Sequence, residues 1–171
     1  MVRVLEIIIS VFGLSIGILF LPVIFIGNAM GNRGTLFYTQ ERVGKDAKVF
    51  KIFKFRTMVK NAESNGAVFT TINDTRINAF GKFLRKTRID EFPQFINILK
   101  GEMAVIGPRP ERPVFVDEIA ALMPFYETRH VIKPGLTGWA QVNYSYGETI
   151  DDSLIKLQYD LYYIKHRSIF L

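Results

Sequence analysis

The sequence contains no cysteine and only two histidines among its 171 residues. Without cysteine there is no disulfide, thiolate nucleophile or cysteine-ligated metal, and nothing opposes a cytoplasmic location. His130 and His166 are too few and too widely separated to predict a histidine metal site. The net charge of +6 suits an anionic partner. Because no helix-turn-helix, zinc or RNA-binding signature accompanies that charge, we do not expect nucleic acid.

Charge is also missing from one long stretch near the N-terminus. The 26 residues of Ile7–Asn32 carry no charged side chain, and ~20 apolar residues suffice to cross a hydrocarbon core. A cleaved signal peptide fits poorly, because Arg3 is opposed by Glu6 and the apolar run exceeds the ~7–15 residues of a signal core. A buried core helix this long would be unusual. We therefore predict a membrane-inserted helix in residues 1–32 and a cytoplasmic domain in residues 33–171.

Pro22 lies well inside this stretch, where its ring cannot donate to the carbonyl of Ile18 and should kink or break the helix. Two topologies stay open: a kinked helix that spans the bilayer, and a re-entrant helix that leaves by the face it entered. Residues 33–60 carry eight basic and two acidic side chains, which places them in the cytoplasm, near anionic lipid head groups. Arg3 on the other flank also prefers the cytoplasm, which favours the re-entrant form.

The rest of the chain predicts an α+β fold that is mostly helical. Thr35–Gln40 and Lys48–Thr57 are rich in β-branched and aromatic residues, and Glu41–Ala47 separates them, which predicts a small β-hairpin. A helix is the alternative for the second segment, because lysine recurs there at every third residue. The polar residues 61–74 predict a loop.

Five further features are expected downstream. They are an amphipathic helix with a basic face around Phe80 and Leu84, a short strand at Met103–Gly107, a helix at Val114–Met123, a type II turn at Lys133–Gly135, and a last helix capped by Asp151.

The densest chemistry lies in Lys82–Glu111. Four basic residues there precede the adjacent carboxylates of Asp90 and Glu91. Apolar residues then repeat with helical spacing up to Gly101, and Pro93 is tolerated only in a first turn, so the helix should begin near Asp90. The acid pair therefore lies at a helix N-terminus, where free N–H groups stabilise carboxylates and bound phosphates alike.

Two interpretations of this acid pair are open. The ordinary one is N-capping with solvation. The other is that one carboxylate attacks phosphorus while the other holds a divalent cation, because aspartate accepts phosphoryl groups and Mg²⁺ binds through one or two carboxylates plus substrate phosphates. The acid pairs Asp117–Glu118 and Asp151–Asp152 lack comparable basic neighbours, which favours a chemical role for Asp90–Glu91.

Three arginines are candidate phosphate ligands, namely Arg56, Arg85 and Arg109. A guanidinium stays charged and binds phosphate oxygens with a planar fork, although a lone arginine is more commonly a solvated surface group. Arg109 differs because the prolines on either side fix its backbone.

The segment Gly135–Val142 (GLTGWAQV) is a candidate substrate loop. Trp139 would stack on a base or sugar, and Gln141 would donate hydrogen bonds. The alternative makes Trp139 a core residue or an interfacial anchor. Helices that combine aromatic and basic residues, such as the last one, suit a membrane interface as well as ordinary packing.

Five motifs follow one another along nearly the whole chain. They are YTQERVG at Tyr38–Gly44, FKFRTM at Phe53–Met58, Asp90–Glu91 followed by NILKGEM at Asn97–Met103, GPRP at Gly107–Pro110, and PGLTGWAQVN at Pro134–Asn143. Any one of them is weak, but together and in this order they resemble the bacterial sugar transferases, the monotopic phosphoglycosyl transferases.

The resemblance implies a reaction. A UDP-linked sugar gives its sugar-1-phosphate to polyprenol (undecaprenyl) phosphate, UMP leaves, and synthesis of an exopolysaccharide or another lipid-linked glycan begins. By this resemblance Asp90 is the nucleophile that forms a phosphosugar-aspartyl intermediate, Glu91 binds Mg²⁺ together with Asp90, and the three arginines bind phosphates. The family's re-entrant helix, broken at Pro22, and interfacial amphipathic helices would hold the catalytic domain on the cytoplasmic face of the bacterial inner membrane.

Some residues depart from the family pattern. Leu21 occupies the position before the membrane proline where serine is common, so that hydroxyl is missing. The family usually continues past the point where this chain stops, at Leu171. Asn143–Gly147 resembles the exopolysaccharide-initiating branch, which commonly has an extra N-terminal membrane region.

Two other classes of function stay open. A non-catalytic, membrane-anchored basic module that binds anionic lipid or a partner protein would tolerate Asp90→Asn. An ordinary metal-dependent glycosyltransferase would carry an Asp-x-Asp motif, which the sequence lacks. The sequence does not identify the transferred sugar, and it leaves an oligomer open.

Overall fold

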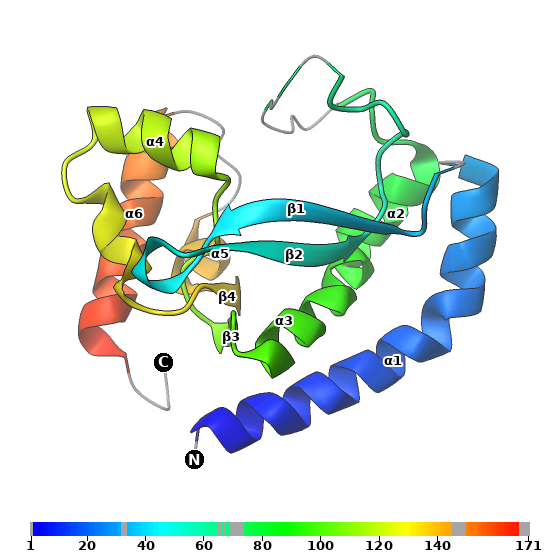
Figure 1. Ribbon diagram of the computed structural model, residues 1–171, viewed down its shortest axis with the longest axis horizontal. Coiled ribbons are helices and arrows are strands. Elements are labelled where there is room, and N and C mark those ends of the chain that lie inside the picture. The colour runs from blue at the N-terminus through cyan, green and yellow to red at the C-terminus, as the bar shows by residue number, and fades with distance from the viewer. Residues whose placement is uncertain are drawn as a thin grey trace.

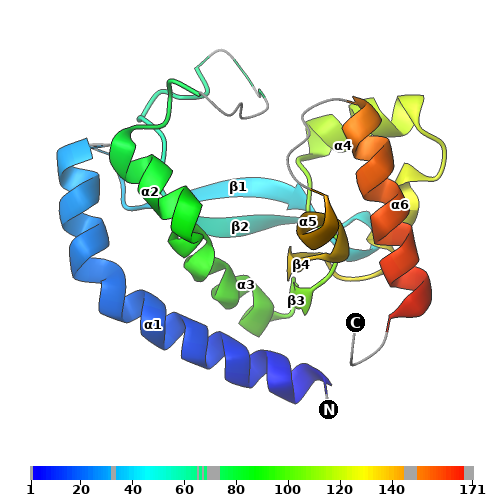
Figure 2. The ribbon, with the colours of Figure 1, turned by 180° about the vertical axis from the view of Figure 1, so that it is seen from behind.

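The structure is a computed structural model that describes residues 2–31, 34–64, 66, 68, 74–144 and 150–167. Helix α1 (Val2–Gly31) lies along one edge of the molecule. A layer formed by α2 (Ala79–Thr87), the 3₁₀ helix η2 (Ile89–Gln94) and α3 (Phe95–Lys100) separates α1 from a β-hairpin (Figure 1, Figure 2). The remaining helices gather around the other end of the hairpin.

Helix α1 has two different faces. Its outer face leaves large apolar side chains in the open, with 76 % of Leu19 exposed. Among the residues that the structure describes, it is the one helix long and apolar enough to cross a membrane. Its inner face packs against the rest of the chain and buries Ser10, Gly13, Gly17, Ile24 and Asn28.

Of the two outcomes expected at Pro22, a kink or a break, the break does not occur, because the helix continues on both sides of the proline. Figure 1 shows instead a change of direction along α1. A bend of this kind accommodates the missing N–H and the ring of a proline without ending the helix. Leu21, next to Pro22, packs against the buried side chains of Ile24, Phe55 and Leu84.

The predicted hairpin is confirmed, and the helical alternative for its second half is wrong. Strands β1 (Phe37–Val43) and β2 (Val49–Phe55) pair antiparallel, with Gln40 opposite Ile52. The predicted first strand ended three residues too early. A short 3₁₀ turn, η1 (Lys45–Ala47), joins the strands.

The layer beside the hairpin differs from the prediction at the acid pair. Asp90 and Glu91 lie in the 3₁₀ helix η2, and the α-helix begins only at Phe95. Pro93 lies buried inside η2, and its missing N–H is compatible with either an α or a 3₁₀ first turn. Gly101 ends α3 with φ 85°, a conformation that favours glycine.

The C-terminal half surrounds the tip of the hairpin. The elements there are β3 (Ala104–Ile106), α4 (Pro113–Leu122), the 3₁₀ helix η3 (Tyr126–Val131), β4 (Gly135–Thr137), α5 (Trp139–Asn143) and α6 (Ile150–His166). The predicted strand and helices are confirmed, except that Asp151 lies inside the first turn of α6. The predicted type II turn is wrong, because Gly135 begins β4, which pairs in parallel with β3.

Three hydrophobic clusters hold these parts together. One joins α1 to α2 and β2 through Ile24 and Leu84, and a second lies between β2 and α3 around Ile52 and Ile98. The third joins the end of β1 to α4 and α6. The predicted α+β class with mostly helical content is thus confirmed among the described residues, with a parallel strand pair that was not foreseen.

Candidate active site

Glu91 is a buried carboxylate held by two cations. Its Oε1 accepts hydrogen bonds from Lys54 Nζ at 3.1 Å and from Arg109 Nη2 at 2.9 Å. Burial alone would raise the pKa of Glu91, but Arg109 and Lys54 together outweigh that effect and hold the pKa far below its usual range. Glu91 is therefore ionised and fixed in position at any physiological pH.

Asp90 is just as buried, but among the described residues it has no comparable ion-pair partner. The residue is 5 % exposed, and its Oδ1 has no hydrogen-bond donor among the described residues. Burial raises the pKa of Asp90, and the positive charges of Lys54 and Arg85 partly oppose this rise. Adjacent carboxylates whose pKa values are driven apart are suited to different tasks.

The arginines predicted from sequence end in different places. Arg109 contacts the acid pair directly, and Arg85 donates from Nε to Thr57 Oγ1 at 2.9 Å while remaining close enough to Asp90 to lower its pKa. Arg56 donates to the backbone oxygen and the hydroxyl of Thr35, both at 2.8 Å. The structure thus brings Arg85 and Arg109 to the acid pair, and it directs the guanidinium of Arg56 toward Thr35.

Sequence reasoning missed two further cations, Lys54 and Arg42. Lys54 is paired with Tyr38 across the hairpin. Successive side chains of a strand point to opposite faces, and this alternation along β2 was the signal that could have identified Lys54 as inward-facing. Arg42 Nη1 is buried without an acceptor among the described residues. Burial lowers the pKa of Arg42 to about 10, with Glu111 opposing and Arg109 adding to the shift. A buried guanidinium nitrogen without an acceptor beside Arg109 suits an anionic ligand.

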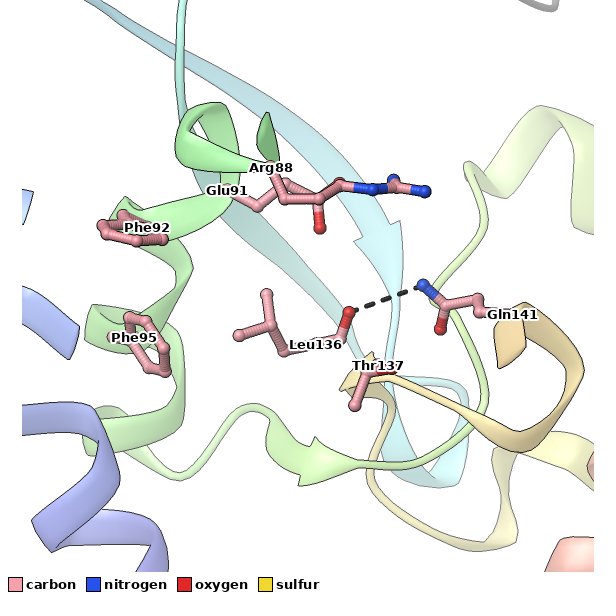
Figure 3. Close-up of a pocket in the computed structure, with 7 residues that line it drawn as sticks. All are labelled: Arg88, Glu91, Phe92, Phe95, Leu136, Thr137 and Gln141. Carbon is pink, nitrogen blue, oxygen red and sulfur yellow. Dashed lines mark hydrogen bonds between the residues drawn. The ribbon is translucent and has the colours of Figure 1, made fainter. Parts of the chain in front are cut away.

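A cavity of about 230 Å³ opens next to Glu91. Its lining residues are Arg88, Glu91, Phe92, Phe95, Leu136, Thr137 and Gln141 (Figure 3). Gln141 reaches it from α5, and its Nε2 makes a long hydrogen bond of 3.5 Å to the Leu136 oxygen. Trp139 does not line the cavity; its ring stacks on Tyr162 with 6.3 Å between centroids.

The backbone around Arg109 is fixed by a buried network. Arg129 Nη2 donates to the Arg109 carbonyl at 2.8 Å and lies 2.7 Å from Asp160 Oδ2, and its Nη1 donates to the Tyr126 hydroxyl. Burial alone would lower the pKa of Arg129, but Asp160, Tyr126 and Glu111 together outweigh that effect and keep the pKa above its usual range. Helix α6 is thereby tied to the Pro-Arg-Pro segment.

The donors present fit a divalent cation bound together with a substrate. Among the described residues, no three histidine or acidic side chains form a metal cluster. The Oδ1 of Asp90, which has no partner within the described part of the chain, suits a cation. One or two carboxylates suffice for Mg²⁺ when substrate phosphates complete its coordination.

A buried acid pair surrounded by cations, on a layer packed against an apolar helix, defines a site for anionic substrates. The model of the family described as bacterial sugar transferase matches residues 1–171. This chain belongs to the bacterial sugar transferase family.

Its similar proteins include two enzymes whose names specify a reaction. A UDP-N-acetylgalactosamine-undecaprenyl-phosphate N-acetylgalactosaminephosphotransferase of Aeromonas hydrophila is 49 % identical over 138 residues, which cover 81 % of this chain and 33 % of that protein. A UDP-glucose:undecaprenyl-phosphate glucose-1-phosphate transferase of Xanthomonas campestris pv. campestris is 42 % identical over 151 residues, 86 % of this chain and 31 % of that protein. The chain spans about a third of the length of these two relatives.

Proposed function

We propose that this chain transfers a sugar-1-phosphate from a UDP-sugar to undecaprenyl phosphate or a similar polyprenol phosphate, and so begins exopolysaccharide or other lipid-linked glycan synthesis. The observation that carries the proposal is the contrast within the acid pair. Glu91 is fixed by Lys54 and Arg109, whereas the buried Oδ1 of Asp90 has no donor among the described residues. The family membership and the names of the relatives support the same reaction.

Asp90 would act as the nucleophile. Its carboxylate oxygen attacks the phosphorus that bears the sugar, a P–O bond to Asp90 forms, and the phosphoanhydride bond to UMP breaks. An oxygen of the polyprenol phosphate then attacks the same phosphorus and releases the Asp90 carboxylate. The product is a polyprenol diphosphate sugar, and Asp90 is regenerated.

The surrounding cations would bind and orient the phosphates during these steps. Arg109 and Lys54 already hold Glu91 next to the nucleophile, and Arg42 and Arg85 add positive charge nearby. Mg²⁺, held by Asp90 and Glu91 together with substrate oxygens, would neutralise charge that develops on the phosphates.

Residues 1–32 would form a re-entrant membrane helix, and residues 33–171 would lie on the cytoplasmic face of the bacterial inner membrane. Both ends of α1 contact the same domain, which supports this topology. Near its start, Arg3 donates to the Ile98 and Leu99 carbonyls at 2.7 and 2.8 Å; near its end, Asn28 donates to the Gly34 carbonyl at 2.8 Å. A helix that crossed the bilayer would separate these ends by a membrane thickness.

Nucleotide release tests the reaction. The detergent-solubilised protein is given Mg²⁺, undecaprenyl phosphate and, in turn, UDP-N-acetylgalactosamine, UDP-glucose and UDP-galactose. We expect one donor to yield UMP, and Asp90→Asn to reduce the rate about 10³-fold or more. Asp117→Asn, an exposed acid on α4, serves as the matched control and should keep the wild-type rate. Equal rates in wild type and Asp90→Asn would contradict the covalent mechanism, and binding of anionic lipid without UMP release would favour a non-catalytic basic module.

A further inference from the structure

The cavity beside Glu91 has an apolar side and a polar side. Phe92, Phe95 and Leu136 form the apolar part, while Arg88 and Gln141 lie across from them (Figure 3). The two phenylalanine rings meet edge to face with centroids 6.0 Å apart. An amphiphile with a charged head and an apolar body matches this division of the lining.

The apolar wall is shared with the membrane helix. Gly13 of α1 lies so close to the Phe95 ring that a methyl group there would collide with it, and Gly17 faces Phe92, where an added Cβ would lie 3.4 Å from the ring. The other face of α1 is apolar and exposed. Phe92 and Phe95 thus pack against the inner face of α1 and also line the cavity, with Phe92 two residues along the chain from Asp90.

Arg88 supplies an unpaired positive charge at the polar side. It is exposed, and its guanidinium has no hydrogen bond or ion pair among the residues that the structure describes. Its backbone has φ 58°, in the left-handed region that side chains other than glycine rarely adopt. This conformation is that of a left-handed helix C-cap, because Arg88 ends α2. The side chain points across the space between Glu91 and Gln141 (Figure 3).

We propose that this cavity is the acceptor site: Arg88 binds the phosphate of the polyprenol phosphate, and Phe92, Phe95 and Leu136 hold its first isoprenoid units. The inference rests on the proposed function and assigns one of its two substrates to a place. The donor nucleotide then approaches the acid pair from the hairpin side, where Lys54, Arg42 and Arg109 lie. Arg88 is a substrate-binding residue of the second half-reaction only.

Steady-state and single-turnover kinetics of Arg88→Gly separate the two half-reactions, attack on the UDP-sugar and transfer to the polyprenol phosphate. Glycine accepts the left-handed backbone, so the substitution removes the guanidinium without adding strain. We expect the KM for undecaprenyl phosphate to rise about tenfold, as for the loss of one charge-assisted hydrogen-bonded contact. The KM for the UDP-sugar and the single-turnover burst of UMP without acceptor should not change. Lys86→Ala, an exposed cation of α2 that does not line the cavity, is the control for general attraction to anionic lipid.

Photo-crosslinking gives a readout that does not depend on turnover. The probe is undecaprenyl phosphate with a diazirine on its first isoprenoid unit, applied to Asp90→Asn. We expect labelling of the peptides that contain Phe92 to Phe95 or Leu136, prevented by undecaprenyl phosphate but not by inorganic phosphate. Labelling of other peptides, or competition by inorganic phosphate alone, would overturn the assignment. So would an Arg88→Gly enzyme in which the KM for the UDP-sugar rises and the KM for undecaprenyl phosphate does not. A wild-type enzyme without any UMP burst would instead contradict the proposed covalent function.

Discussion

Replacing Asp160 by leucine tests whether the buried network behind Arg109 holds the fold together. Arg129 and Asp160 are 6 % and 2 % exposed, and the nearest nitrogen and oxygen are 2.7 Å apart. Leucine has a similar size but leaves Arg129 buried without its counter-charge. Removing one partner of a buried ion pair costs about 3–5 kcal/mol. At about 2–4 °C per kcal/mol for a chain of this length, Asp160→Leu should lower Tm by roughly 6–20 °C.

Thermal unfolding in detergent, followed by near-UV circular dichroism, measures this change. Asp151→Leu is the matched control, because Asp151 lies in the same helix but is exposed, and its loss should cost about 1 kcal/mol or less. Equal Tm values for Asp160→Leu and Asp151→Leu would refute the reasoning.

The double variant Arg129→Met with Asp160→Leu separates stability from positioning. Replacing both charges by apolar residues should recover most of the lost Tm, since the uncompensated charge is gone. The Arg109 carbonyl still loses the 2.8 Å hydrogen bond from Arg129. We therefore expect a folded protein with a lowered rate of UMP release. A double variant with full stability and full rate would show that Arg129 does not position Arg109.

Two further predictions concern the acid pair and the membrane helix. Burial raises the pKa of Asp90, and Lys54 only partly opposes it, so the acid limb of single-turnover UMP release should lie above the ordinary aspartate value of about 3.9. The pKa of Asp90 is higher in the folded than in the unfolded protein, so its ionisation lowers stability as pH rises from the unfolded to the folded pKa. Asp90→Asn should therefore unfold at a higher Tm than wild type at neutral pH. A lower Tm would contradict this. Gly13→Leu should cost about 1–3 kcal/mol through collision with Phe95, whereas Ser15→Leu on the exposed face should leave Tm nearly unchanged.

Local sequence patterns were sufficient for elements whose contacts are local. The enrichment of two segments in β-branched and aromatic residues predicted the hairpin, and Gly101 predicted the end of α3. The same reasoning misplaced the start of the α-helix at Asp90, because one proline is compatible with either an α or a 3₁₀ first turn, and the packing around Pro93 decides between them.

Features that depend on distant partners were not predictable in the same way. Strands β3 and β4 have three residues each, and Ala104 pairs with Gly135 across a long separation in sequence. Arg129 and Asp160 likewise carry no local sign of their ion pair. Lys54 was hidden by the three-residue spacing of lysines, which resembles a solvated helix face. Only the register that pairs it with Tyr38 shows that it faces inward to Glu91.

The acid pair owes its geometry to elements on both sides of its layer. On the hairpin side, Asn97 is fully buried, accepts from the Phe53 N–H at 3.1 Å and donates to the Lys51 carbonyl at 2.8 Å, which fixes α3 against β2. On the other side, Gly13 lies against Phe95, and Arg3 binds the last carbonyls of α3. Because η2 runs directly into α3, α1 packs against the same layer that carries the acid pair. Helix α1 and the layer that carries the acid pair are therefore one packed unit.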